Sequence, residues 1–177
     1  ARLLFSTAEW YDFNQNDIWT FFHSYAFDFS VWEIWGSLLY GGQLIVVPYL
    51  ASRSPQAFYR LLKDRKVSVL NQTPSAFPQL IEYVDALEIG TDEKFTSLSL
   101  RTVIFGVEAL DISKLEIWFE NRKDNNCCLV NMYGITETTV HVTYLPLTEQ
   151  ELTNPNHNAI GKKIPDLQMY ILDIHLN

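Results

Sequence analysis

The nine residues from Asn131 to Thr139 include side chains that could bind a nucleotide. They combine the aromatic ring of Tyr133, a glycine, the carboxylate of Glu137 and three threonine hydroxyls. A nucleotide needs a flat face for its base, donors for its phosphates and an acid for the magnesium ion. A simpler alternative is a turn at Tyr133 and Gly134 in which the threonines satisfy nearby backbone groups. The residue types alone leave both interpretations open.

The apolar run from Cys127 to Val130, directly before this stretch, predicts a buried parallel strand. Asp28, Asn71 and Gly106 each follow another strand-like run. The carboxyl ends of parallel strands meet at one edge of a sheet, where ligands bind. We therefore expect these residues to converge on the Asn131 loop. Further strands are expected at residues 18–27, 44–47, 67–70 and 100–105.

Helical patterns separate these strands. One begins with Ser54 as N-cap and Pro55 at the first helical position, and another has Pro78 in its first turn. Asp111 is expected to cap a third. The alternation predicts an α/β fold, with a mostly parallel sheet flanked by helices on both faces. Helices are expected at residues 31–40, 55–66, 73–84 and 113–122, a short helix or turn starting at residues 6–9, and a polar loop at residues 90–99.

The pattern changes after residue 145. Residues 146–158 are polar and irregular, and residues 167–172 alternate like an exposed antiparallel strand. We expect residues 1–145 to form an α/β subdomain and residues 146–177 to be the incomplete start of a β-barrel-like subdomain. The chain opens at Ala1 and stops just after a strand-like segment, so we expect an excerpt of a longer protein.

The composition limits the classes of partner. A net charge of −8 and a pI near 4.9 argue against binding to nucleic acid or to an anionic membrane. Aromatic residues make up 14% of the chain and charged residues only 19%, so we expect much of the surface to contact other protein. The adjacent Cys127 and Cys128 are poorly placed for a disulfide, which favours the cytoplasm. The apolar stretch from Val31 to Leu50 is too interrupted to span a bilayer.

Five motifs, in this order along the chain, together resemble one known family. The motifs are Phe27-Asp28-Phe29-Ser30 with Val31-Trp32-Glu33, Asn71-Gln72-Thr73-Pro74-Ser75, Phe105-Gly106-Val107-Glu108-Ala109, Asn131 to Thr139, and Ile160-Gly161-Lys162-Lys163-Ile164-Pro165. With them the sequence resembles the amino-acid adenylation domains of nonribosomal peptide synthetases, and the resemblance covers essentially the whole chain.

The resemblance implies a ligase. Such domains join an amino-acid carboxylate to the α-phosphate of ATP with Mg²⁺, giving an aminoacyl-adenylate and pyrophosphate. They then pass the aminoacyl group to the phosphopantetheine thiol of a peptidyl carrier protein, beside neighbouring synthetase modules. The excerpt lacks the family's upstream phosphate loop, its downstream ribose-binding aspartate and its mobile C-terminal portion with the catalytic lysine. The isolated piece is therefore expected to be inactive.

The resemblance also assigns roles to residues. Asp28 would bind the α-ammonium group, a charge-assisted contact, although it could instead cap the following helix. Phe27 would border the reacting carboxylate or simply be a core aromatic. Thr136 would touch phosphate and Glu137 would hold magnesium, as the two catalytic positions, because developing charge must be balanced by fixed donors and metal. The nucleotide slot would comprise Gly106, Val107, Glu108, Ala109, Asn131, Tyr133 and Thr136.

The side-chain pocket implied by the resemblance looks like that of threonine-activating domains. Its hydroxyl partners would be Asn71 or His141, and a satisfied polar residue near a strand end is the alternative for both. Such a site rejects an analogue lacking the hydroxyl by roughly 10⁴-fold or more, whereas one extra methyl group on the substrate is worth only about 10–200-fold. We therefore expect firm rejection of valine and weaker rejection of serine. The pocket would comprise Asp28, Phe29, Trp32, Asn71, Ile104, Gly106, Met132, Val140 and His141.

Two positions depart from the family pattern, and two other functions compete. Ile135 replaces the usual proline, and Val107 replaces a glycine, where we expect it to accept ordinary backbone geometry.

An acyl-CoA or aryl-acid ligase of the same superfamily is one alternative function. Asp28 argues against it, because a carboxylate would repel a substrate that has no ammonium group. A noncatalytic α/β protein-interaction module is the other, and it predicts no convergence of Asp28, Tyr133 and Glu137.

Overall fold

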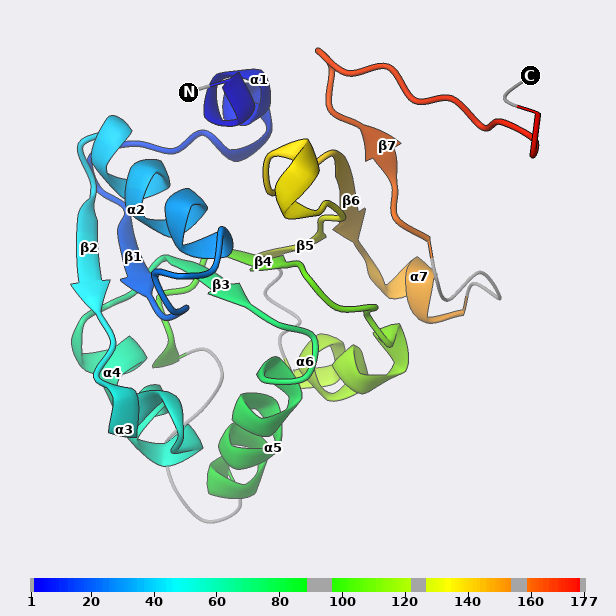
Figure 1. The fold of residues 1–177 in the computed structure, drawn as a ribbon. Coiled ribbons are helices and arrows are strands. Elements are labelled where there is room, and N and C mark those ends of the chain that lie inside the picture. The colour runs from blue at the N-terminus through cyan, green and yellow to red at the C-terminus, as the bar shows by residue number, and fades with distance from the viewer. Residues whose placement is uncertain (1, 89–96, 122–126, 154–158, 176–177) are drawn as a thin grey trace.

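The computed structural model describes residues 2–88, 97–121, 127–153 and 159–175. Seven strands lie side by side in the order β2-β1-β3-β4-β5-β6-β7 (Figure 1). Strands β1 to β5 pair in parallel, and β6 and β7 are antiparallel to their neighbours. The strands are β1 Ile18–Phe21, β2 Gln43–Val46, β3 Val69–Gln72, β4 Thr102–Phe105, β5 Cys128–Asn131, β6 Thr143–Leu147 and β7 Lys162–Lys163.

Helices lie on both faces of this sheet, which confirms the predicted fold class. Helices α1 and α2 lie on one side, and α4, α5 and α6 on the other (Figure 1). The helices are α1 Arg2–Tyr11, α2 Phe29–Leu39, α3 Tyr49–Ser52, α4 Pro55–Asp64, α5 Phe77–Glu88, α6 Glu116–Asn121 and α7 Glu149–Leu152, with 3-10 turns η2 Ile112–Leu115 and η3 Thr136–Thr138.

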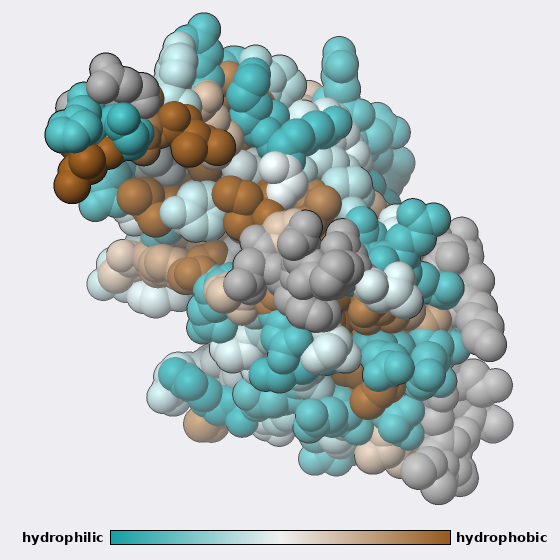
Figure 2. Space-filling view, turned by 90° about the vertical axis from the view of Figure 1, so that its right-hand side faces the viewer, coloured by the Kyte–Doolittle hydropathy of each residue, from teal (hydrophilic) through white to brown (hydrophobic). Residues whose placement is uncertain are grey.

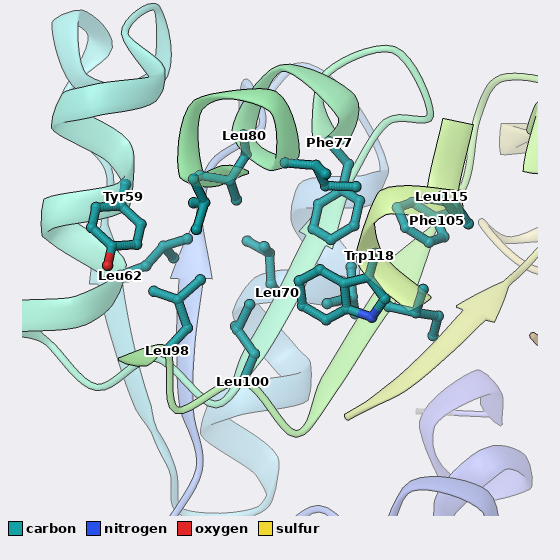
Figure 3. Close-up of a cluster of buried hydrophobic side chains, with 14 of the residues drawn as sticks. Tyr59, Leu62, Leu70, Phe77, Leu80, Leu98, Leu100, Phe105, Leu115 and Trp118 are labelled. Carbon is teal, nitrogen blue, oxygen red and sulfur yellow. The ribbon is translucent and has the colours of Figure 1, made fainter. Parts of the chain in front are cut away.

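Two apolar clusters cover the two faces of the sheet. Side chains of α4, α5, η2 and α6 pack on one face (Figure 3), and those of α1 and α2 on the other. Leu70, Val103 and Leu129 point into the first cluster, whereas Val69 and Ile104 point into the second. Neighbouring strand residues face opposite sides, so nearly continuous apolar runs fit a sheet covered on both faces.

Local signals account for several element ends. The Ser54 side chain accepts a hydrogen bond from the Ala57 N–H (3.3 Å), and Asp111 accepts one from Ser113 (3.2 Å). Both are therefore N-caps, as predicted. Pro78 lies in the first turn of α5, where its missing N–H has no intrahelical partner to lose.

Several sequence expectations about boundaries were wrong. Strand β1 ends at Phe21 and the chain then turns, so the segment from Phe22 to Phe27 is not strand. Helix α1 runs straight through residues 6–9, which therefore do not start a helix. The predicted helix at 113–122 begins as a 3-10 turn. Residues 90–96 of the predicted polar loop lie outside the described residues.

The region after residue 145 also differs from the prediction. Strand β6 continues across this position and pairs with β5 in the main sheet, so the predicted boundary falls inside a strand. Within the described part of the chain, residues 167–172 form no strand, because no neighbouring strand supplies hydrogen-bond partners. The division into residues 1–145 and 146–177 remains a prediction.

The surface mixes apolar and polar side chains. On the face drawn in Figure 2, hydrophobic and hydrophilic patches alternate. Large exposed apolar side chains include Trp35 and Leu38 on α2 and Ile171 and Ile174 near the C-terminal end of the described chain. None of the described helices has the length and hydropathy that crossing a bilayer would require.

Candidate functional site

The strand ends that were predicted to converge are level with one another. Asn71 on β3 pairs with Ile104 on β4, and Phe105 on β4 pairs with Asn131 on β5. The residues that follow β4 and β5 therefore leave the sheet at the same edge. The prediction that separate segments meet at one rim is confirmed for these strands, because the parallel register leaves no stagger between them.

A buried cluster surrounds the ring of His141 at this edge. The rings of Phe29 and Trp32 lie edge-on to it, with centroids 5.2 and 5.4 Å away. A Cβ built on Gly106 would be 3.0 Å from the His141 ring, so a larger residue at this position would crowd the histidine. The indole N–H of Trp32 donates to the Asn71 side-chain oxygen (3.0 Å).

Two further residues of the predicted pocket join the same side of the sheet. Ile104 and Met132 are buried in the α1–α2 cluster with Phe29 and Trp32. The Met132 sulfur accepts a hydrogen bond from the Tyr11 hydroxyl (2.9 Å), which fixes the end of α1 against the pocket. Seven of the nine predicted pocket residues are thus buried within one cluster: Phe29, Trp32, Asn71, Ile104, Gly106, Met132 and His141.

Polar atoms in this cluster lack partners. Among the residues that the structure describes, the buried atoms without a hydrogen bond include Asp28 Oδ2, Asn71 Nδ2 and both ring nitrogens of His141. Buried polar groups are nearly always hydrogen-bonded, and each exception requires an explanation. Three such residues at one sheet edge fit a site whose partner is a ligand.

The alternative role of Asp28 as a helix cap is not observed. It is the residue before α2, but in the described structure its side chain accepts no cap hydrogen bond. Its backbone carbonyl instead accepts the Val31 N–H (2.9 Å). The carboxylate is therefore available, directly before Phe29 of the buried cluster.

Five of the seven predicted nucleotide-binding residues line a cleft of about 300 Å³, and Gly106 and Thr136 do not. Its volume lies at the lower end of the range for small-molecule sites. Tyr133, which is 47% exposed, can present a ring face to a base. The lining comprises Val107, Glu108, Ala109, Leu110, Asn131, Met132, Tyr133, Gly134, Ile135, Ala159 and Ile160. Met132 belongs both to this cleft and to the buried cluster, so the two are contiguous.

Hydrogen bonds hold the walls of the cleft in place. Glu108 accepts a hydrogen bond from the Ser75 N–H (3.1 Å), which links the loops after β3 and β4. The Asn131 side chain donates to the Ala159 carbonyl (3.3 Å). Tyr133 is anchored through its carbonyl by Val142 and its N–H by Thr143.

Gly134 joins the cleft to the buried cluster. A Cβ at this position would be 2.1 Å from the Val140 carbonyl oxygen and 2.7 Å from the His141 Cα. Only glycine allows this approach. It brings the chain at Val140 back against the Tyr133 loop, so that Tyr133 faces the cleft while His141 faces the cluster.

Backbone strain gathers around the same site. Val107 has φ 80° and Val140 has φ 66°, in the left-handed region that β-branched residues avoid. The expectation of ordinary geometry at Val107 was wrong, because the turn after β4 keeps a backbone suited to glycine. Ile135 is extended at φ −129°, which a proline ring does not permit. Strain of this kind is found at binding sites where surrounding structure enforces it.

Thr136 and Glu137 lie on the exposed turn η3 and do not line the cleft. The described residues contain no cluster of three or more potential metal-binding side chains. A single carboxylate suits Mg²⁺, which binds through one or two carboxylates together with phosphates and water. Glu137 therefore fits a magnesium ion that arrives with a nucleotide.

His23 and Glu33 were not among the predicted site residues. Both are buried beside Phe29, and the His23 Nδ1 lies 3.0 Å from a Glu33 oxygen. The available signal was that Glu33 is the one charged residue in the sequence of α2 and lies four residues after Phe29, on the same face of the helix.

A larger cleft of about 1000 Å³ lies near the ends of β1, β2 and β3. Its lining includes His23, Arg53 and Gln72 but none of the predicted site residues. Gln72, Thr73 and Ser75 of the second motif line this larger cleft, whereas the predicted nucleotide-binding residues line the smaller cleft beside Tyr133.

Burial lowers the pKa of His141 from 6.5 to about 3. The folded protein thus keeps a neutral ring, whereas the unfolded chain takes up a proton below pH 6.5. Stability is therefore expected to fall as the pH drops from 6.5 towards 3, by about 2 kcal/mol at pH 5. Thermal unfolding of the intact protein and of His141→Gln between pH 7 and 5 measures this. The midpoint should fall more steeply in the wild type, and parallel declines would contradict the buried neutral ring.

The sequence is similar to those of known peptide synthetases. It is 53% identical, over 99% of its length, to the dimodular nonribosomal peptide synthase of Bacillus subtilis (strain 168). It is 47% identical, over 98% of its length, to syringomycin synthase SyrB1 of Pseudomonas syringae pv. syringae. The chain spans 7% and 27% of these two proteins.

Solved structures have the same fold. The holo form of PA1221, a nonribosomal peptide synthetase protein containing adenylation and carrier-protein domains bound to a vinylsulfonamide inhibitor, matches 93% of this chain with a TM-score of 0.75 and 25% identity. FmoA3 matches 97% with a TM-score of 0.83, and at 20% identity it supports the fold alone. The chain covers 26% and 18% of those structures. The model of the AMP-binding enzyme family matches residues 1–177, and the chain therefore belongs to this family.

Proposed function

We propose that this chain is part of a nonribosomal peptide synthetase adenylation domain, a ligase that activates an amino acid with ATP. One observation supports this most strongly. A cleft of about 300 Å³ beside Tyr133 adjoins, through Met132, a buried cluster at which Asp28, Asn71 and His141 have unpartnered polar atoms among the described residues. An adenylating enzyme needs this pairing of a base-binding cleft with a polar-lined pocket.

Asp28 binds the α-ammonium group of the substrate. Its Oδ2 atom is buried and lacks a partner among the described residues, and its side chain does not cap α2. A carboxylate in that state is stabilised by a cation, and the ammonium supplies one. This assignment separates amino acids from plain carboxylic acids, which would be repelled.

The amino acid is L-threonine. Trp32 is a donor only, so it fixes the Asn71 oxygen as acceptor and leaves the Nδ2 group to donate. Neutral His141 has one donating and one accepting nitrogen. A threonine hydroxyl accepts from Asn71 and donates to His141, while Ile104 and Val140 contact its methyl group. The aromatic rings of Phe29 and Trp32 limit the volume of the pocket.

The nucleotide lies in the Tyr133 cleft. The adenine packs on the Tyr133 ring, opposite the segment from Gly106 to Ala109, and Asn131 completes the slot. Thr136 contacts phosphate and Glu137 holds Mg²⁺, which supplies positive charge to the phosphates when bound. A carboxylate oxygen of the amino acid attacks the α-phosphorus, the bond to the bridging oxygen breaks, and pyrophosphate leaves. Thr136 provides a fixed donor where the charge develops.

A peptidyl carrier protein receives the activated amino acid. The thiol of its phosphopantetheine attacks the mixed anhydride, which releases AMP. This step uses further parts of the synthetase, since the chain spans only 7% and 27% of its two relatives, and the segment after β6 leads towards them. For the same reason the isolated chain is inactive.

Exchange of labelled pyrophosphate into ATP by the intact synthetase tests this function. We expect exchange that depends on an added amino acid and on Mg²⁺. Fatty and aryl acids serve as the control panel. Exchange with those acids alone would instead support an acyl-CoA or aryl-acid ligase, and no exchange with any acid, in a folded protein, would favour a noncatalytic module.

A further inference from the structure

Glu33 is a buried carboxylate on the inward face of α2. Its side chain is fully buried. The two oxygens accept hydrogen bonds from the backbone N–H groups of Phe22 (3.2 and 3.3 Å) and His23 (3.1 Å). These groups lie directly after the end of β1 and have no strand partner to bond there. Glu33 therefore ties the end of β1 to α2.

His23 completes this contact. Its Nδ1 lies 3.0 Å from Glu33 Oε1, and its ring packs on that of Phe29 with centroids 4.5 Å apart and planes at 32°. The Phe27 ring lies 6.0 Å away. The imidazole is thus held between the carboxylate and an aromatic residue of the proposed amino-acid pocket.

The contact between His23 and Glu33 joins the start of the loop that carries Asp28 to helix α2. Residues 22–28 connect β1 to α2, and the Phe27 N–H donates to the Ser24 carbonyl (2.9 Å) within that loop. Glu33 on α2 bonds the first two residues of this loop, and the last residue of the loop, Asp28, leads directly into α2. Both ends of the loop are therefore attached to α2, which limits how far Asp28 can shift. Three donors surround the Glu33 carboxylate: the N–H groups of Phe22 and His23, and the His23 ring. Without them, burial of a charged carboxylate would be unfavourable.

We propose that His23 and Glu33 are positioning residues that hold the Phe27-Asp28-Phe29 segment in place for amino-acid binding. This rests on the proposed function. Neither residue lines the cleft beside Tyr133, so their substitution affects binding of the amino acid and not of the nucleotide. Displacing a binding group by about 1 Å can reduce a rate by about a hundredfold.

The kinetic test uses pyrophosphate exchange by the intact synthetase. Glu33→Ala and His23→Phe are expected to raise KM for the amino acid about tenfold, with KM for ATP unchanged. His23→Phe keeps a ring against Phe29 and removes only the hydrogen bond. Glu33→Gln retains an acceptor for the amides, so it should recover most of the loss. Glu120→Ala and His175→Phe, both at exposed positions, are the matched controls.

Hydrogen–deuterium exchange provides a readout that needs no activity. The amides of residues 22–28 should exchange faster in His23→Phe than in the wild type, with residues 131–143 unchanged. If Glu33→Ala does not fold, His23→Phe decides the matter. An unchanged amino-acid KM in a folded His23→Phe, or an equal rise in both KM values, overturns the positioning role alone. A wild type that exchanges pyrophosphate with no amino acid overturns the proposed function as well, even where the amides of residues 22–28 are protected.

Discussion

Threonine is expected to be activated about 10⁴-fold more efficiently than valine, measured as kcat/KM in pyrophosphate exchange by the intact synthetase. The two amino acids are nearly equal in shape, so the pocket cannot separate them by volume. Valine would place a methyl group against the Asn71 Nδ2 and the His141 ring, which are buried and lack other partners in the described structure. Leaving these polar groups unsatisfied is what penalises valine.

Serine offers the same hydroxyl without the methyl group. The kcat/KM for serine should be only about 10–200-fold lower than that for threonine, because one methyl group contributes little more.

Asn71→Leu removes the donor and leaves Trp32 without its acceptor, so it should bring the kcat/KM values of threonine and valine within about tenfold of each other. Asn121→Leu, at an exposed position of α6, is the control. Valine activated as well as threonine by the wild type would rule out the threonine assignment.

Asp28→Ala should lower kcat/KM for the amino acid about a hundredfold to a thousandfold, which corresponds to about 3 to 4 kcal/mol. Removing the carboxylate leaves the substrate ammonium unpaired in a largely buried site. Because the side chain does not cap α2, the substitution should leave the thermal unfolding midpoint almost unchanged. Pyrophosphate exchange together with a thermal melt separates loss of binding from loss of folding.

Asp64→Ala, on the exposed surface of α4, is the matched control and should behave as wild type. Asp28→Asn keeps the size and an acceptor but removes the charge, so it should lie close to Asp28→Ala if charge is the dominant contribution. Full activity in Asp28→Ala would exclude the ammonium contact.

Features set by neighbouring residues could be predicted from the sequence. Ser54, Pro78 and Asp111 act within one turn of their own position, so their roles followed from residue type and spacing. The parallel sheet followed from apolar runs alternating with helical patterns. Because parallel strands end at one edge, Asn71 and Gly106 could be placed together at the rim without coordinates.

Features that depend on residues far away in the chain could not be predicted from the sequence. The end of β1 at Phe21 depends on Glu33, twelve positions later, which takes the backbone amides that a longer strand would have used. Residues 167–172 have an alternating pattern, but a strand also needs a neighbour to pair with. The left-handed backbone at Val107 follows from the path of the turn, and valine itself would have indicated the opposite.

The sequence by itself determined the α/β architecture, the edge at which the motifs gather and the family to which they point, because these depend on periodicity and local residue types. Only the tertiary structure decided that Asp28 is free of a capping role, that Asn71 and His141 have unpartnered buried atoms, and that His23 and Glu33 link β1 to α2. Burial and hydrogen bonding are set by segments far apart in the chain, and those meet only when the sheet and its helices pack together.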